Sequence, residues 1–112
     1  MSRVYKIVSQ TAWAAAQAAG TFKGAEIDPQ DGYIHLSTAA QAAETARRHF
    51  FGVEGLVLVA FEADGLNGLK WEPSRGGDLF PHVYGALDPG LAIAVTPLPL
   101  TAAGWPDPGA LV

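Results

Sequence analysis

The chain has no cysteine among its 112 residues. That absence excludes disulfide bonds, catalysis by a thiolate and cysteine-based zinc sites, and nothing in the residue usage indicates an oxidising compartment. Long apolar runs are also missing: residues 1–8 carry no core of the length of a signal peptide, and no stretch approaches the ~20 apolar residues of a membrane span. We therefore expect a soluble, cytoplasmic protein without a membrane partner.

Basic side chains are few as well. Seven Lys and Arg stand against eleven Asp and Glu, which gives a formal net charge of −4. Contacts with nucleic-acid phosphates need clustered cations, so the bulk charge argues against a nucleic-acid partner and leaves a local anion pocket as an option. With 49% hydrophobic residues, no internal repeat and no linker, residues 1–112 are expected to form a single domain around one core.

Several catalytic motifs are absent. The sequence contains no Gly-x-Ser-x-Gly elbow, no Gly-rich phosphate loop and no dinucleotide fingerprint. Its three histidines, His35, His49 and His82, are widely spaced without a His-x-x-x-His pair, so we expect no metal site. Because His49 follows Arg47 and Arg48 on a predicted helix, it is expected on the solvated surface.

Two helices are predicted in the first half of the chain, over residues 10–19 and 39–50, and residues 21–31 read as a loop. The signals that bound the helices are the caps Ser9 and Thr38 (or Ser37), the terminator Gly20 and the capping-box residue Gln41. Strands are expected over residues 3–8, 33–36, 56–61, 69–72, 83–85 and 91–96. Because the later strands follow one another without helices between them, the pattern predicts an α+β domain with mainly antiparallel strands. A compact barrel-like β fold with two helical caps is the alternative.

Two histidines stand in short strand-like segments with polar or aromatic groups two residues apart. Alternation along a strand directs Tyr33, His35 and Ser37 to one face, and it aligns Phe80, His82 and Tyr84 in the same way. We take these two ridges to be neighbours that form the floor of a small cleft. Every prediction about the site depends on that proximity.

Each candidate site residue can also be interpreted as having a purely structural role. His35 can serve as an acid, a base or an anion ligand, or it can be a half-buried histidine bonded to a backbone carbonyl. Ser37 precedes a helix, so its hydroxyl can cap the helix or join the helix N-terminus in binding a phosphate or carboxylate. Glu72 can hydrogen-bond a ribose or stabilise a developing cation, and Arg75 can reach an anionic ligand. Both are also compatible with plain surface positions.

The chain resembles the bacterial domain-of-unknown-function family numbered 952 over nearly its whole length. The segments that carry the resemblance are Tyr5-Lys6-Ile7, the helix end from Trp13 to Gly20, Gly32-Tyr33-Ile34-His35-Leu36-Ser37-Thr38 with Gln41, the strand from Leu56 to Phe61, and Phe80-Pro81-His82-Val83-Tyr84-Gly85. That family has no established activity. Its fold is similar to the ADP-ribosyltransferase superfamily, whose split α+β sheet clasps NAD in a cleft.

The resemblance implies a role for each position. Lys6 stands where relatives in the superfamily usually carry a histidine that holds the nicotinamide-side ribose, and lysine cannot accept or share a proton as imidazole does. Tyr33 and Ser37 with His35 would lie beside the nicotinamide. Glu72 would approach a ribose hydroxyl, a position for which His82 with Tyr84 is the alternative.

The sequence thus leads to an NAD-binding, ADP-ribosyltransferase-like protein, with NAD as substrate rather than resident cofactor. It would stabilise an oxocarbenium-like ribose as nicotinamide leaves, with His35, Ser37 and Tyr84 lining the cleft. One rival is a non-catalytic module that binds a small anion or nucleotide in the same cleft. Another is RNA 2′-phosphotransferase-like chemistry, in which histidines and arginines grip a phosphate.

Overall fold

The computed structural model describes residues 2–25, 28–109 and 111–112, with the side chain of Arg75 outside that description. The helices are α1 (Gln10–Ala19), α2 (Asp28–Asp31) and α3 (Ala39–His49), and short 3-10 turns cover Ala63–Gly65, Arg75–Gly77 and Pro89–Leu91. The strands are β1 (Arg3–Ser9), β2 (Ile34–His35), β3 (Ser37–Thr38), β4 (Leu56–Glu62), β5 (Leu69–Pro73), β6 (Leu79–Val83) and β7 (Ala94–Leu98).

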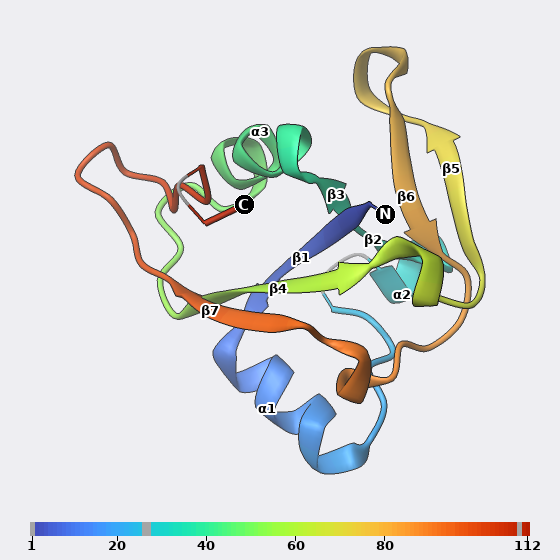
Figure 1. Cartoon of the computed structure of the whole chain (residues 1–112). Coiled ribbons are helices and arrows are strands. Elements are labelled where there is room, and N and C mark those ends of the chain that lie inside the picture. Colours follow the sequence, from blue (N-terminus) through green and yellow to red (C-terminus); the bar gives the residue numbers. More distant parts are fainter. Residues whose placement is uncertain (1, 26–27, 110) are drawn as a thin grey trace.

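Within the described residues, the strands form two antiparallel sheets (Figure 1). One sheet has the order β3-β1-β4-β7, and the other has the order β2-β6-β5. The predicted α+β class with antiparallel strands is confirmed. The barrel-like alternative is wrong, because the strands separate into two sheets.

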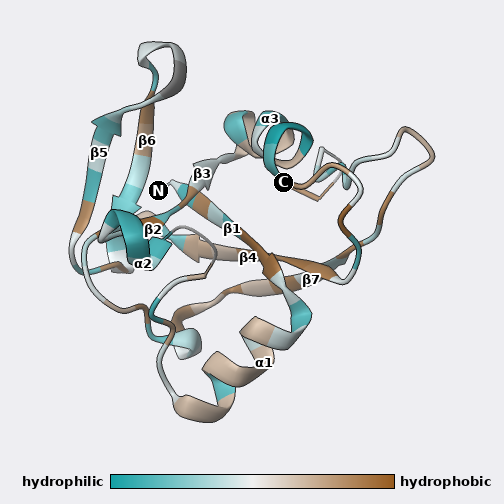
Figure 2. Ribbon diagram, turned by 180° about the vertical axis from the view of Figure 1, so that it is seen from behind, coloured by the Kyte–Doolittle hydropathy of each residue, from teal (hydrophilic) through white to brown (hydrophobic). Residues whose placement is uncertain are grey.

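Strand β4 lies in the middle of the larger sheet and is buried on both faces, as its unbroken apolar run predicts. Val57, Val59 and Phe61 pack on the side of α1, whereas Leu58 and Ala60 pack on the side of α3. The expectation of one core therefore needs correction, since the buried apolar residues form two clusters separated by the sheet. Figure 2 shows the brown, apolar strands β1 and β4 between the two helices.

The expected strand 33–36 continuing to Ser37 is broken at Leu36. Residues before the break, in β2, pair with β6, and residues after it, in β3, pair with β1. The amide of Leu36 donates to the carbonyl of Pro81 instead of continuing either ladder. The chain therefore passes from the small sheet to the large sheet within five residues, and the side chains predicted to form one ridge lie where the two sheets meet.

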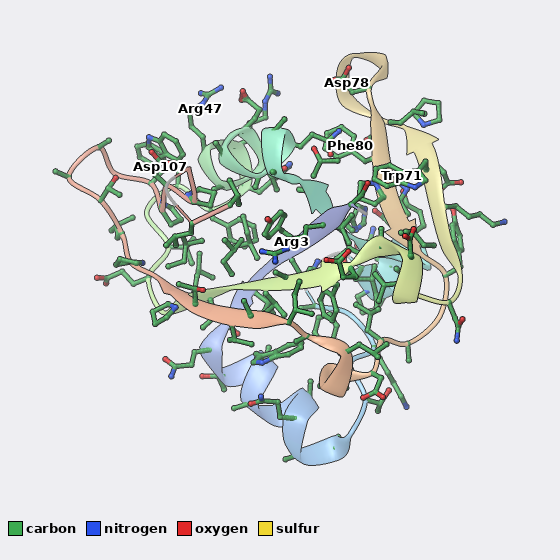
Figure 3. All side chains as sticks on the ribbon, viewed as in Figure 1. Arg3, Arg47, Trp71, Asp78, Phe80 and Asp107 are labelled. Carbon is green, nitrogen blue, oxygen red and sulfur yellow. The ribbon has the colours of Figure 1, made fainter. Side chains whose placement is uncertain are left out.

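Other boundaries also differ from the prediction. Strand β6 begins at Leu79 and ends at Val83, so Tyr84 follows the strand instead of lying inside it. Strand β7 begins only at Ala94, because Asp88 accepts a hydrogen bond from the Gly90 amide and the chain turns there first. The β5–β6 hairpin projects from the body of the protein, with Asp78 near its tip (Figures 1 and 3).

None of the described helices has the length and apolar character that a membrane crossing requires.

The two long helices have the predicted caps. Ser9 accepts a hydrogen bond from the Ala12 amide, and Gly20 ends α1 in the left-handed conformation with φ of 75°. Helix α3 begins with a capping box, in which Thr38 Oγ1 accepts from the Gln41 amide and Gln41 Oε1 accepts from the Thr38 amide. Thr38, rather than Ser37, is therefore the cap.

The capping box gives a direct test of local stability. Thr38→Ala leaves the Gln41 amide without its acceptor and should lower the free energy of unfolding by about 1 kcal/mol in urea denaturation. Thr11→Ala, on the exposed face of α1, is the matched control and should stay within about 0.5 kcal/mol of the wild type. Equal losses in the two variants would contradict a capping role for Thr38.

Candidate functional site

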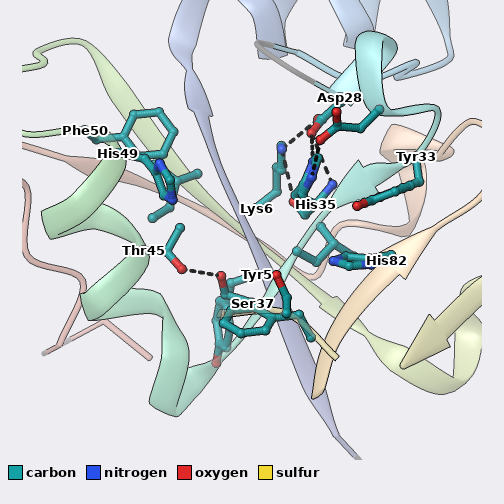
Figure 4. Close-up of a pocket in the computed structure, with 15 residues that line it drawn as sticks. Tyr5, Lys6, Asp28, Tyr33, His35, Ser37, Thr45, His49, Phe50 and His82 are labelled. Atoms are coloured by element: carbon teal, nitrogen blue, oxygen red, sulfur yellow. Dashed lines mark hydrogen bonds and ion pairs between the residues drawn. The ribbon is translucent and has the colours of Figure 1, made fainter. Parts of the chain in front are cut away.

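A cleft of about 540 Å³ opens where the two sheets meet (Figure 4). Strand β1, the β2–β3 segment, α2, α3 and β6 all contribute to its walls. Its volume lies within the roughly 300–1,000 Å³ of small-molecule sites. The lining residues are Tyr5, Lys6, Ile7, Asp28, Asp31, Tyr33, His35, Leu36, Ser37, Thr45, His49, Phe50, Ser74, Phe80 and His82.

The two histidines of the predicted ridges are neighbours, as the sequence analysis assumed. His35 and His82 are direct partners across the antiparallel β2–β6 pair, and their ring centroids lie 5.4 Å apart. Tyr33 stacks on His82 with centroids 4.3 Å apart and an interplanar angle of 27°. The same tyrosine also contacts His35, at 4.6 Å, and Tyr84, at 5.2 Å. The register of one short strand pair therefore creates this aromatic cluster.

A buried carboxylate, Asp28, holds one end of the cleft together. Its Oδ2 accepts from Lys6 Nζ at 2.7 Å and from the Ala25 amide at 3.0 Å. Its Oδ1 accepts from the His35 amide at 3.2 Å and lies 2.5 Å from His35 Nδ1. Only 2% of the Asp28 side chain and 7% of the Lys6 side chain are exposed. Lys6 also donates to the carbonyl of His35 at 3.0 Å, so three chain segments meet at this ion pair.

The environment of Asp28 favours its ionised form. Burial by itself raises the pKa of this carboxyl, but the hydrogen bond with His35 and the charge and hydrogen bond of Lys6 act in the opposite direction. Their combined effect, with the Ala25 amide, lowers the pKa from 3.8 to about 2. Asp28 is therefore a carboxylate at any pH near neutrality.

The second ring nitrogen of His35 faces another acid. His35 Nε2 lies 3.0 Å from Asp31 Oδ2, on the last residue of α2. Each ring nitrogen of His35 thus has a carboxylate oxygen beside it. The alternative in which His35 merely bonds a backbone carbonyl is wrong, because its ring lies against Asp28 and Asp31.

His82 has a different set of partners. Its Nδ1 lies 2.8 Å from Glu72 Oε1, and the hydroxyl of Tyr84 donates to the same oxygen at 2.8 Å. The hydrogen bonds from His82 and Tyr84 hold the pKa of Glu72 below its usual value, while Glu72 raises the pKa of Tyr84. At the centre of the cluster, burial and the charges of Asp31, Glu72 and Asp28 raise the pKa of Tyr33.

Hydroxyl groups gather on the opposite wall of the cleft, toward α3. Ser37 Oγ lies 3.0 Å from Thr45 Oγ1, and Tyr5 is close to Ser37 (Figure 4). His49 and Phe50 complete this wall from the end of α3. His49 is exposed, as predicted, but it faces the cleft and is therefore not plain outer surface.

The structure brings most of the candidate residues together, and their roles stay predictions. The cleft is lined by Lys6, Tyr33, His35, Ser37 and His82. Glu72 and Tyr84 are not lining residues, so the expectation that Tyr84 lines the cleft needs correction. The reason is the boundary of β6: Tyr84 follows the strand and is 41% exposed, beside Glu72. Arg75 belongs to the turn after β5, and its side chain lies outside the described residues.

Sequence reasoning missed the acids of α2, Asp28 and Asp31. The signal that would have found them is the run Asp28-Pro29-Gln30-Asp31, since proline and acidic residues in the first turn are typical of a helix start. Thr45 was also missed, because nothing in a helix sequence shows which residue faces a distant strand. Among the described residues, no group of three histidine or acidic side chains is arranged to hold a metal ion.

Residues 7–95 match the family described as "Protein of unknown function (DUF952)". The chain belongs to this family. The resemblance that the sequence motifs indicated is thereby confirmed, whereas the further likeness to ADP-ribosyltransferases stays a prediction. A comparison with curated proteins finds no match.

Solved structures of one bacterial protein, CC0527 from Caulobacter crescentus, are similar to this chain. Its crystal structure is 46% identical with a TM-score of 0.94, and the match covers 97% of this chain and 96% of that one. Its solution NMR structure is 46% identical with a TM-score of 0.88, and that match covers 100% and 97%. This DUF952 chain therefore shares its whole fold with CC0527.

The buried ion pair predicts a large loss of stability when one partner is removed. Asp28→Asn keeps the shape of the side chain but removes the carboxylate charge 2.7 Å from the buried Lys6 ammonium, which should cost about 3–5 kcal/mol in urea denaturation. Asp64→Asn, at an exposed turn, is the control and should change the free energy of unfolding by less than about 0.5 kcal/mol. A small effect at Asp28 would show that the carboxylate does not hold the cleft together.

The lowered pKa of Asp28 also predicts that the free energy of unfolding depends on pH in the acid range. Because its pKa is lowered in the folded state from 3.8 to about 2, ionised Asp28 stabilises the fold fully above pH 3.8, and this contribution is lost as pH falls through about 2. The shift corresponds to about 2 kcal/mol. The stability gap between wild type and Asp28→Asn should therefore shrink by about this amount between pH 5 and pH 2, measured by urea midpoints. A constant gap would contradict the lowered pKa.

Proposed function

We propose that the cleft binds the ribosyl end of NAD, or of a related nucleoside with a cationic base, and promotes cleavage of the bond between ribose and base. The observation that carries this proposal is the charge balance of the cleft. Lys6, the one lysine among the described lining residues, is matched by Asp28, and Asp31 is a second acid of the lining, so acids are in excess. Such a site favours a ligand group that is cationic, or that becomes cationic as it reacts.

Three basic side chains of the cleft lie beside acids. The Lys6 ammonium is paired with Asp28, and His35 lies between Asp28 and Asp31. His82 is held by Glu72. Within the described residues, these contacts leave no lysine or arginine of the cleft directed at a phosphate. The two small-anion readings, a phosphate-binding module and a 2′-phosphotransferase, are therefore less well supported than the ribosyl reading.

The chemistry suits such a ligand. Cleavage of a nicotinamide–ribose bond passes through an oxocarbenium-like ribose, and the base departs as a neutral molecule. Acidic groups around the cleft lower the energy of the positive charge as it moves onto the sugar. The hydroxyls of Ser37 and Thr45, on the opposite wall, supply polar partners for the sugar hydroxyls. The likeness to the ADP-ribosyltransferase superfamily that the sequence motifs predict agrees with this reading, as an analogy of fold.

A second candidate is a module that binds the same ligand without turnover. The observation that supports it concerns the contacts of Lys6. By the resemblance to the superfamily, this residue stands at the position of a ribose-holding histidine. Its Nζ is already engaged by Asp28 and by the His35 carbonyl. Under this reading the ligand binds and is recovered intact.

Ligand titration followed by calorimetry and thermal melting tests the proposal. NAD and nicotinamide riboside should bind and raise the melting temperature, since a ligand of the folded state stabilises it. NADH should bind more weakly because its reduced ring has lost the positive charge, and inorganic phosphate should not bind. Free nicotinamide, followed by chromatography, then separates turnover from binding alone.

A charge variant makes this test specific. Asp31→Asn removes one acid of the cleft and should weaken NAD binding about two- to fivefold, the size of a partly exposed charge contact. Asp64→Asn removes the same charge from an exposed residue that does not line the cleft and is the control. Tighter binding of phosphate or NADH than of NAD would overturn the ribosyl proposal and favour a small-anion module.

A further inference from the structure

His82 is held in a way that distinguishes it from the other histidine of the cluster. It lies on β6 between β2 and β5, paired with His35 on one side and with Lys70 on the other. Its Nδ1 is 2.8 Å from Glu72 Oε1, and Tyr33 stacks on its ring. Only 5% of the His82 side chain is exposed. Packing and one strong contact therefore fix the orientation of this imidazole.

The contact with Glu72 determines where the proton sits in neutral His82. An ionised carboxylate only accepts hydrogen bonds, so the ring must donate through Nδ1–H, and Nε2 then carries a lone pair. Tyr84 supports this state, because its hydroxyl donates to the same Glu72 oxygen at 2.8 Å. With two donors directed at it, Glu72 stays ionised and keeps its place beside the ring.

The hydrogen bond with Glu72 occupies Nδ1 of His82 and leaves Nε2 as the ring nitrogen available to a ligand. His82 lines the cleft (Figure 4), whereas Glu72, which lies beside Nδ1, is outside the lining, and we infer from this that the Nε2 edge of the ring is the one that faces the cavity. Within the described residues, Nε2 has no hydrogen-bond partner. By contrast, both ring nitrogens of His35 lie against carboxylate oxygens, at 2.5 and 3.0 Å.

We propose that Nε2 of His82 is the general base of this site, with Glu72 and Tyr84 as positioning residues that hold the ring in its Nδ1–H form. The inference rests on the proposed function and adds the identity of the proton acceptor. It also specifies the co-reactant: water or another hydroxyl compound that enters the cleft beside His82.

The lone pair of His82 Nε2 takes a proton from the attacking hydroxyl, and the hydroxyl oxygen forms a bond to C1′ of the ribose. The bond between C1′ and the nicotinamide nitrogen breaks, and its electron pair stays on that nitrogen, which neutralises the pyridinium ring. His82 becomes an imidazolium, which Glu72 stabilises through Nδ1, and the proton later leaves to solvent.

Nitrogen NMR of the histidine rings tests the proton position without any ligand. In 15N-labelled wild type at pH 8, long-range proton–nitrogen correlations should show His82 as the Nδ1–H tautomer, which is the less common one in free histidine. Glu72→Ala should move His82 to the Nε2–H tautomer, and Glu62→Ala, on the outer end of β4, is the control that should not. An Nε2–H tautomer in the wild type would overturn the proposal.

A kinetic comparison tests the base itself. His82→Asn keeps an N–H group in reach of Glu72 but removes Nε2, so nicotinamide release should fall about 100-fold or more while NAD affinity is retained. Glu72→Gln should lower the rate with little change in affinity, and Glu62→Gln should leave it unchanged. A wild-type rate in His82→Asn would refute the base. Should NAD neither bind nor react, the proposed substrate fails, and the tautomer experiment still decides the state of His82.

Discussion

The ion pair between Asp28 and Lys6 is the interaction on which the cleft depends. One carboxylate, with 2% of its side chain exposed, faces four nitrogen atoms from three segments of the chain: Lys6 Nζ, the Ala25 amide, and the amide and ring Nδ1 of His35. Removing two charges from water is costly, and a buried pair often contributes little net stability compared with apolar residues of the same size. Its effect is therefore positional: its hydrogen bonds link β1, α2 and β2 to one another.

The position of the cleft follows from a break in one short segment. A continuous strand over residues 33–38 would place Tyr33, His35 and Ser37 on a single face of one sheet. The break at Leu36 instead gives His35 to the small sheet and Ser37 to the large one. The side chains of His35 and Ser37 then belong to different walls of the cleft. The acids Asp28 and Asp31 lie on the wall of His35, and the hydroxyl of Thr45 lies on the wall of Ser37. A site with two chemically different walls results from a departure from regular structure.

Sequence patterns correctly predicted the features of the fold that local interactions determine. Ser9, Gly20, Thr38 and Gln41 specify the helix ends through contacts within four residues, so these features were found correctly. The neighbouring position of the two histidines was also anticipated, though only as an assumption. Asp28 was missed because its partners stand 22 and seven residues away in sequence, and a four-residue helix has too few local contacts to be recognised. The place of Glu72 behind His82 likewise required the register of β5 on β6.

The two histidines illustrate how environment assigns different chemistry to one residue type. They are direct partners across a strand pair, their rings are 5.4 Å apart, and both contact Tyr33. Yet His35 has an acid at each ring nitrogen, whereas among the described residues His82, which also lines the cleft, has an acid at only one. Two acids suit a ring that stays in place as part of the wall, while one acid suits a ring that exchanges a proton with a ligand. The number of carboxylates around each ring, rather than the presence of histidine, is therefore the feature on which the proposal gives His35 a place in the wall and His82 the role of base.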